Sequence, residues 1–286
     1  MLYLGCPMWG YKAWVGDFFP PRTPANAFLR LYSRKFSSVE GNTTFYSLPA
    51  TETVARWVQE TPETFRFCPK VLRDISHAPA LDAPKQTIDL FVQRMRGLGT
   101  RCGPIFMQLP PAFTPAHLPR LQAFLDSWPD DLQLAVEVRH ADFFQAPQED
   151  ALNNLLSTYN VARVMMDIRP LQTGTAKEQR ELLGRERKPA LPLHPVATTD
   201  FTFLRYIGHP DPTVNGPFLQ EWATQLGQWH QQGRTLYVFC HCPYEEHSPA
   251  ICVQFYQQIR KQIPLPPQSW QFAKADTPIV EQGRLF

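Results

Sequence analysis

This chain of 286 residues lacks the sequence features that identify several common protein classes. Its formal net charge is only +2, which does not argue for a protein of nucleic acid or membrane surfaces, although it leaves room for a local basic patch. No apolar run approaches the roughly 20 residues that cross a bilayer. Residues 1–10 have no basic segment and no small-residue cleavage site of a signal peptide. We therefore expect a cytoplasmic protein with no membrane partner.

The chain also lacks the short motifs of several catalytic sites. The segment Gly5–Gly10 does not have the G-x-G-x-x-G spacing that follows the first strand of a dinucleotide-binding sheet. There is no G-x-S-x-G nucleophile motif and no H-E-x-x-H or H-x-x-E-H run. These absences argue against an open doubly wound sheet, covalent acyl transfer and a metal site of the zincin type. No cofactor follows from the sequence.

Cysteine is present without zinc-site spacing, because no second cysteine pair stands at the separation that zinc sites use. A large chain without a signal peptide is expected to keep its thiols reduced. We expect most of the six to fill the core: Cys6, Cys68, Cys102, Cys240, Cys242 and Cys252.

What the chain does have is eight short apolar runs, most of them separated by segments with helical periodicity. The runs are Leu2–Met8, Ser37–Thr43, Arg66–Val71, Ile105–Leu109, Leu132–Arg139, Ala162–Ile168, Phe201–Gly208 and Thr235–Cys242. This alternation predicts an α/β fold, namely a TIM-type (β/α)8 barrel with eight parallel strands and outer helices. We expect one domain over residues 1–263, a charged insertion at about 169–199, and a proline-rich tail at 264–286.

Most of these runs end in polar residues, at positions where a strand that serves only for packing would have apolar ones. They are Glu40, Asn42, Lys70, Gln108, Glu137, Arg139, Asp167, Arg205 and His241. Residues two apart share one face of a strand, so the polar groups follow inward-facing apolar or small ones. Barrel enzymes place their sites at the carboxyl ends of the strands. We therefore expect these side chains to converge on one cavity, with His140, Trp9 and Tyr46 as further ligand-binding candidates.

Two interpretations of the charged residues remain open. Glu40 and Glu137 are candidate catalytic acids or bases, or they form ion pairs that satisfy buried charges. Lys70, Arg139 and Arg205 are candidate ligands for a phosphate or carboxylate, or they neutralise Glu40, Glu137 and Asp167.

Histidines and aromatic residues near the strand ends add weaker alternatives. His77 and His241 could join carboxylates in a metal site, but a single histidine is more often a structural group. The aromatic loops that contain Trp9 and Tyr46 could stack on a sugar or base, but such loops more often cover a core.

Longer motifs resemble the YecE-like family, known as domain of unknown function 72. The resemblance runs from about residue 2 to residue 263 and is carried by Gly5 to Trp9, Phe18-Phe19-Pro20, Val39-Glu40-Gly41-Asn42-Thr43-Thr44-Phe45-Tyr46, Gln108-Leu109-Pro110-Pro111-Ala112-Phe113 and Val136-Glu137-Val138-Arg139-His140. It implies a TIM-type barrel and no particular reaction. The chain differs from the family pattern at Arg205–His209 and at His241-Cys242, both near the expected site.

Three functions fit this reading. The first is an enzyme or binding protein for a phosphorylated or sugar-like ligand at the strand ends. The second is a metal-dependent phosphodiesterase or isomerase. The third is a nucleic-acid-binding module in which residues 180–188 contact backbone phosphates, which the low net charge disfavours. The sequence does not determine the oligomeric state.

Overall fold

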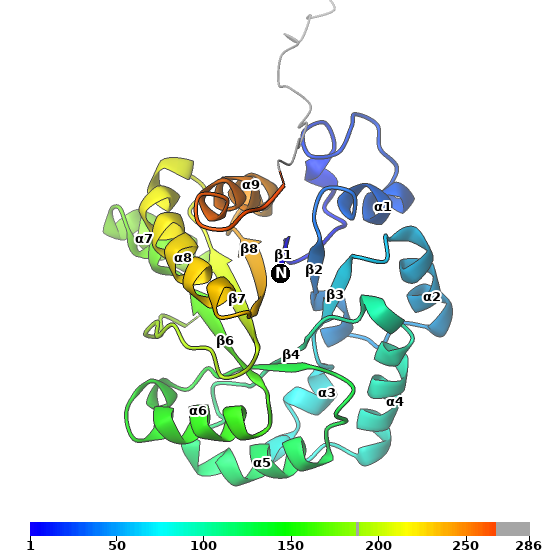
Figure 1. Ribbon diagram of the computed structural model, residues 1–286, viewed down its shortest axis with the longest axis vertical. Coiled ribbons are helices and arrows are strands. Elements are labelled where there is room, and N and C mark those ends of the chain that lie inside the picture. Colours follow the sequence, from blue (N-terminus) through cyan, green and yellow to red (C-terminus); the bar gives the residue numbers. More distant parts are fainter. Residues whose placement is uncertain (187–188, 267–286) are drawn as a thin grey trace, which may run out of the picture.

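Eight parallel strands form two sheets in the computed structural model, which describes residues 1–186 and 189–266 (Figure 1). The larger sheet has six strands in the order β1 (Leu2–Gly5), β8 (Thr235–His241), β7 (Phe201–Ile207), β6 (Ala162–Asp167), β5 (Leu134–Glu137) and β4 (Ile105–Gln108). The smaller sheet pairs β2 (Ser38–Gly41) with β3 (Arg66–Pro69). The prediction of an α/β fold with parallel strands is confirmed.

The prediction of a closed eight-stranded TIM barrel is wrong, because no continuous ladder joins the two sheets. Between β1 and β2, side-chain hydroxyl groups take places that a ladder would give to the main chain. The Tyr32 hydroxyl accepts from the Cys6 N–H at 2.6 Å and donates to the Ser38 carbonyl at 3.0 Å. The Ser37 hydroxyl accepts from the Leu4 N–H at 2.9 Å. The large sheet is therefore a half-barrel, and the two-stranded sheet stands beside it.

Scattered main-chain hydrogen bonds connect the sheets at both seams. The amide of Glu40 donates to Cys6 at 3.1 Å across the β1–β2 seam. Across the β3–β4 seam, the amide of Gly103 donates to Phe67 at 2.7 Å, and that of Val71 donates to Phe106 at 2.8 Å. These contacts keep the strand ends of both sheets close together without making one sheet of them.

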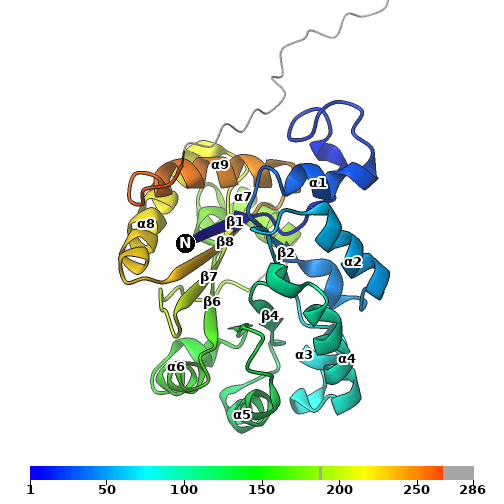
Figure 2. The same ribbon diagram turned by 45° about the vertical axis from the view of Figure 1, so that its right-hand side comes forward.

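Helices surround the strands on their outer side (Figures 1 and 2). They are α1 (Phe28–Tyr32), α2 (Thr51–Glu60), α3 (Arg73–Ser76), α4 (Lys85–Arg96), α5 (Leu118–Ser127), α6 (Gln148–Thr158), α7 (Ala176–Glu186), α8 (Pro212–Gln231) and α9 (Ser248–Ile259). Apolar residues at helical spacing, such as Val54 and Trp57 of α2, are buried against the strands. In the described residues, no helix has both the length and the apolar character required to cross a membrane.

One apolar cluster packs the helices against the strands, and a second lies between the two sheets. Its members alternate with the outward-facing residues along each strand. They are Tyr3, Cys68, Phe106, Ala135, Ala162, Val164, Phe201, Phe203, Tyr237 and Phe239. Side chains from seven strands thus fill the interior, and the next inward position on most of these strands is polar.

The region predicted as an insertion contains a short 3-10 turn at Arg169–Gln172 and helix α7. Residues 187–188, which belong to the predicted basic arm at residues 180–188, lie outside the described residues. The predicted tail at 264–286 also lies outside them, except for residues 264–266, where the Tyr256 hydroxyl donates to the Pro266 carbonyl at 2.6 Å. The domain boundaries stay predictions.

Candidate functional site

Arg205 lies at the centre of a group of buried charges. Its Nε and Nη2 atoms donate to the two carboxylate oxygens of Glu40 at 2.9 and 2.8 Å. Its Nη1 atom donates to Glu137 at 2.7 Å. Arg205 is on β7 and Glu137 on β5, whereas Glu40 is on β2 of the smaller sheet. The paired guanidinium–carboxylate contact therefore joins the two sheets, and it has the two-pronged geometry that favours arginine.

Further polar groups complete this arrangement around Glu40 and Glu137. The Nε2 atom of His241 lies 3.0 Å from Glu40. The Asn42 side-chain amide donates to Glu40 at 2.8 Å and to the Pro7 carbonyl at 3.2 Å. Arg139 donates through Nε to Glu137. Both carboxylates therefore have several donors, as buried charges require.

Lys70 stands at the other end of this group and has different partners. Its ammonium donates to the Gln108 side-chain oxygen at 3.0 Å, and Arg139 donates to the same oxygen at 3.1 Å. The ammonium also lies 4.3 Å from the ring centre of Phe45 and 5.4 Å from that of Phe106. In the described part of the chain, no carboxylate oxygen lies within 4.0 Å of it.

We call this set the carboxyl-end network. It comprises Glu40, Asn42, Lys70, Gln108, Glu137, Arg139, Arg205 and His241. These residues come from the last positions of β2, β3, β4, β5, β7 and β8 or the positions just after them. The alternation of the strands turns all of them toward the interior, above the apolar cluster.

The short turn after β2 places an aromatic ring on Lys70. Residues Asn42–Phe45 form a 3-10 turn, and the Thr44 hydroxyl bonds to the Lys70 main-chain carbonyl at 2.6 Å. This bond fixes the turn against the end of β3, so that Phe45 covers the ammonium group. Phe106 reaches the same group from β4 because it shares a strand face with Gln108.

The two carboxyl groups of the network are ionised at neutral pH. Burial opposes ionisation of Glu40, but the charges of Arg205 and His241 outweigh burial and hold its pKa well below the usual range. Burial also opposes ionisation of Glu137, but Arg139, Arg205 and Lys70 lower its pKa to about 2.

The surroundings of Lys70 disfavour its charged form, whereas those of Glu40 and Glu137 favour theirs. Burial is the main cause that lowers its pKa to about 8, and Arg205 adds to this effect, while Glu137 and Glu40 partly offset it. His77 has a lowered pKa for similar reasons, namely burial and then the charges of Lys70, Arg73 and Arg139. Positive charge therefore accumulates on the Lys70 side of the network.

Asp167 does not join the network, although the sequence suggested it as a partner for the cations. It accepts from the Trp222 indole N–H at 2.7 Å and from the Arg169 main-chain amide at 2.9 Å. Its side chain also forms an ion pair with Arg169 at 2.9 Å. Asp167 directly follows Met166 on β6, and it faces outward toward α8, because Ala162 and Val164 face inward.

Three other predicted site residues lie outside the network. His140 is half-buried and accepts from the Asp142 amide at 3.3 Å. Trp9 packs edge-to-face on Trp57 of α2, with ring centres 5.2 Å apart, on the outer side of the strands. Tyr46 is 79% exposed and contacts Phe45. Their predicted roles in ligand binding stay untested.

The predicted metal candidates His77 and His241 occupy separate places. His77 lies 3.0 Å from the Ser76 hydroxyl and packs against Phe45, whereas His241 pairs with Glu40. Within residues 1–186 and 189–266, no group of three or more His, Cys, Asp or Glu side chains is arranged to hold a metal ion.

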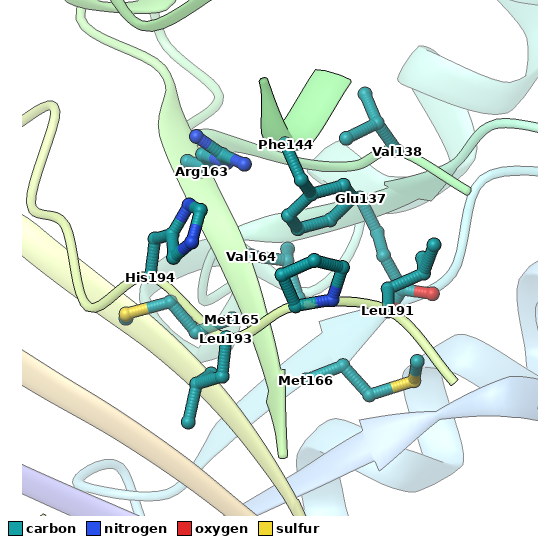
Figure 3. Close-up of a pocket in the computed structure, with 11 residues that line it drawn as sticks. Glu137, Val138, Phe144, Arg163, Val164, Met165, Met166, Leu191, Leu193 and His194 are labelled. Carbon is teal, nitrogen blue, oxygen red and sulfur yellow. The ribbon is translucent and has the colours of Figure 1, made fainter. Parts of the chain in front are cut away.

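A small pocket adjoins the network beside β5 and β6 (Figure 3). Glu137 and Met166 line it from the strands, and residues 191–194 close it. Its volume of about 20 Å³ is far below the roughly 300 Å³ of a small-molecule site. Nearby, Arg163 pairs with Glu149 at 2.6 Å, and His194 also pairs with Glu149 at 2.8 Å. No pattern in the sequence indicated this second set of contacts.

With this geometry established, the chain can be compared with known proteins. Residues 3–272 match the family described as Protein of unknown function DUF72. The chain belongs to this family. It is 38% identical over 265 residues to the YecE protein of Escherichia coli K12, covering 92% of this chain and 94% of that protein. It is 22% identical over 259 residues to the YunF protein of Bacillus subtilis, covering 83% and 87%. The predicted YecE-like membership is confirmed.

Solved structures of DUF72 family proteins have a similar fold. A protein from Enterococcus faecalis aligns with a TM-score of 0.71 at 19% identity, covering 97% of this chain and 99% of that chain. One from Thermotoga maritima aligns with a TM-score of 0.70 at 19% identity, covering 91% and 99%. These similarities establish the fold and leave the chemistry to the residues of the site.

Proposed function

We propose that this DUF72 family protein binds a small anionic ligand, carrying a phosphate or carboxylate group, beside Lys70 and Arg139. One observation supports this above others. Because Asp167 faces outward, the network holds at least three cationic side chains (Lys70, Arg139 and Arg205) against two carboxylates (Glu40 and Glu137), a surplus of at least one positive charge, to which a protonated His241 adds. An unbalanced buried charge is costly, and a bound anion would relieve it.

The cations of the network differ in how far carboxylates match their charge. Arg205 contacts both carboxylates, so its charge is matched within the protein. Within residues 1–186 and 189–266, the Lys70 ammonium contacts an amide oxygen and two rings but no carboxylate, which leaves it available to an anion. Arg139 approaches the same amide oxygen, so that the two cations flank one position. Guanidinium and ammonium groups together are suited to phosphate or carboxylate oxygens.

The carboxylates have a supporting role in this proposal. A group with a pKa of about 2, such as Glu137, does not supply a proton near neutral pH. Glu40 is held ionised in the same way. We therefore assign Glu40 and Glu137 to orienting the cations, in preference to the acid or base role that the sequence suggested.

The proposal is tested by thermal unfolding of the full chain with inorganic phosphate, a sugar phosphate or chloride at equal ionic strength. Phosphate compounds should raise the midpoint more than chloride does. A ligand at 100 times its dissociation constant stabilises by about 2.7 kcal/mol.

Variants locate the effect. Lys70→Gln should abolish the phosphate response, and Arg139→Gln should weaken it. The control is Lys85→Gln, because Lys85 is an exposed lysine that pairs with Asp89 on α4. The proposal fails if no phosphate compound stabilises the protein beyond chloride, or if Lys70→Gln retains the full response.

A further inference from the structure

Lys70 combines properties that are seldom found together in a lysine that serves only for packing. The residue is 8% exposed, yet its amine lies at the carboxyl ends of the strands beside the half-buried Phe45. Among the described residues, its amine donates to the neutral Gln108 side chain. Aromatic rings contact the amine on two sides, and no carboxylate oxygen of the described residues lies within 4.0 Å of it. Arg139 is positioned next to it through the same Gln108 oxygen.

We propose that Lys70 is a nucleophile that forms an imine with a small carbonyl compound whose anionic group is held by Arg139. This inference rests on the anion site proposed above and specifies its substrate class. The ligand would carry a ketone or aldehyde close to its carboxylate or phosphate group, as 2-oxo acids and keto phosphates do. The amine and the guanidinium both donate to the Gln108 oxygen, so a short ligand that displaces this oxygen reaches both.

The chemistry requires no oxidant or metal ion. The neutral amine attacks the carbonyl carbon, a C–N bond forms as the C=O π bond breaks, and a proton moves from nitrogen to oxygen. The resulting carbinolamine takes up a proton on its hydroxyl group and loses water, which leaves a protonated imine. We assign the passage of these protons to and from solvent to His77, whose ring packs against Phe45 with centres 5.2 Å apart.

The protonation state of Lys70 supports this assignment. An imine-forming amine must be neutral when it attacks, and burial is the means by which proteins lower the pKa of such lysines. The pKa of Lys70 is lowered from 10.5 to about 8. At pH 7 this raises the neutral fraction roughly 300-fold over an ordinary lysine. Carbonyl compounds should therefore select Lys70 over the exposed lysines of the chain.

Reductive trapping tests the inference. The full chain is incubated at pH 7 with pyruvate or with dihydroxyacetone phosphate in the presence of cyanoborohydride, which reduces an imine to a stable secondary amine. Intact mass and peptide mapping then identify the modified residue. We expect a single adduct on Lys70, formed at least ten times faster than on Lys85, and suppressed by inorganic phosphate.

Two variants sharpen the result. Lys70→Arg keeps the positive charge and should give no adduct, whereas the matched change Lys85→Arg should leave trapping unchanged. Phe45→Ala uncovers the amine and should change the trapping rate at Lys70 without moving the adduct elsewhere. If Lys70→Arg does not fold, mapping of the unmodified protein and competition by phosphate decide the question.

The outcomes separate the two proposals. Labelling spread over the exposed lysines, or no adduct on Lys70 while phosphate still stabilises the protein, overturns the imine and leaves the anion site standing. Absence of both the adduct and the phosphate response overturns both proposals. Trapping by the keto phosphate alone, or by the 2-oxo acid alone, supports the inference and identifies the anionic group.

Discussion

Arg205 and Lys70 are two cations of one network with opposite surroundings. Both are buried, and both lie over the ring of Phe106, with centroid distances of 4.8 and 5.4 Å. Arg205 contacts two carboxylates, whereas Lys70 contacts an amide oxygen. The pKa of Arg205 is accordingly raised, although burial opposes this, because Glu40 and Glu137 stabilise its charge. The difference distinguishes a cation matched by two carboxylates from one that, in the function we propose, binds the ligand.

The position of Arg205 explains why it needs two carboxylates. The two sheets share no continuous ladder, so side-chain contacts must hold their inner faces together. Glu40 belongs to the smaller sheet and Glu137 to the larger one, and Arg205 bonds to both. Among the described residues, Lys70 forms no comparable link between charges, so our proposal requires a ligand to displace only its contact with Gln108.

The largest loss of stability is expected when Arg205 is replaced. Arg205→Met leaves Glu40 and Glu137 buried with fewer partners, and removal of one member of a buried ion pair costs about 3–5 kcal/mol. Denaturant unfolding followed by circular dichroism measures the loss. Arg96→Met is the control, because Arg96 is exposed and pairs with the exposed Asp131. A loss below about 1 kcal/mol for Arg205→Met would show that the sheets do not depend on this link.

Acidic pH should lower the free energy of unfolding through the two carboxylates that Arg205 contacts. The pKa of Glu137 is about 2 in the folded protein against 4.5 unperturbed, so the unfolded chain binds more protons between these values. Its contribution of about 3 kcal/mol is complete above about pH 4.5 and is lost as the pH falls toward 2. Glu40 acts in the same direction. Urea unfolding at a series of pH values tests this, and a Glu137→Gln variant should show a shallower acid decline. Equal slopes for the two proteins would contradict the assignment.

At the Lys70 end, ionisation opposes folding, whereas ionisation of Glu137 favours it. The folded state binds the Lys70 proton less tightly than the unfolded state, with a pKa of about 8 against 10.5. Stability should therefore rise as the pH increases from about 8 to 10.5, and Lys70→Met should remove that rise. At pH 7 the same variant should be more stable by about 1–2 kcal/mol, because it no longer buries an unmatched charge. It should also lose the response to phosphate. A destabilised Lys70→Met protein would indicate that Lys70 serves the fold.

Much of this arrangement could be predicted from the sequence. Alternation along the strands correctly placed Glu40, Glu137 and Arg205 on inner faces, because a period of two is a property of any β-strand. The same rule brings Phe106 to the face of Gln108, a signal that was present but unused. The pairing of Arg205 with both carboxylates could not be predicted, since it depends on which strands face one another across the interior.

Two errors have physical causes that a strand pattern does not contain. Closure of a barrel depends on ladder hydrogen bonds at every seam, and here the hydroxyl groups of Tyr32 and Ser37 take such places between β1 and β2. Asp167 ends its strand as the other polar residues do, yet it lies one position out of phase with the inward side chains of β6. A shift of one residue turns a side chain to the opposite face.

Asp167 provides the smallest and most selective test of the comparison. Asp167→Asn keeps the size of the side chain and one acceptor for the Trp222 indole, but it removes the negative charge beside Arg169. We expect a loss of about 1 kcal/mol in unfolding free energy, which is typical of one weakened hydrogen-bonded contact. The phosphate response should stay unchanged, because Asp167 faces α8 and not Lys70. Thermal unfolding with and without phosphate measures both quantities. A stronger phosphate response in Asp167→Asn would mean that Asp167 does neutralise the network cations, and the surplus of charge at Lys70 would then no longer support a ligand site.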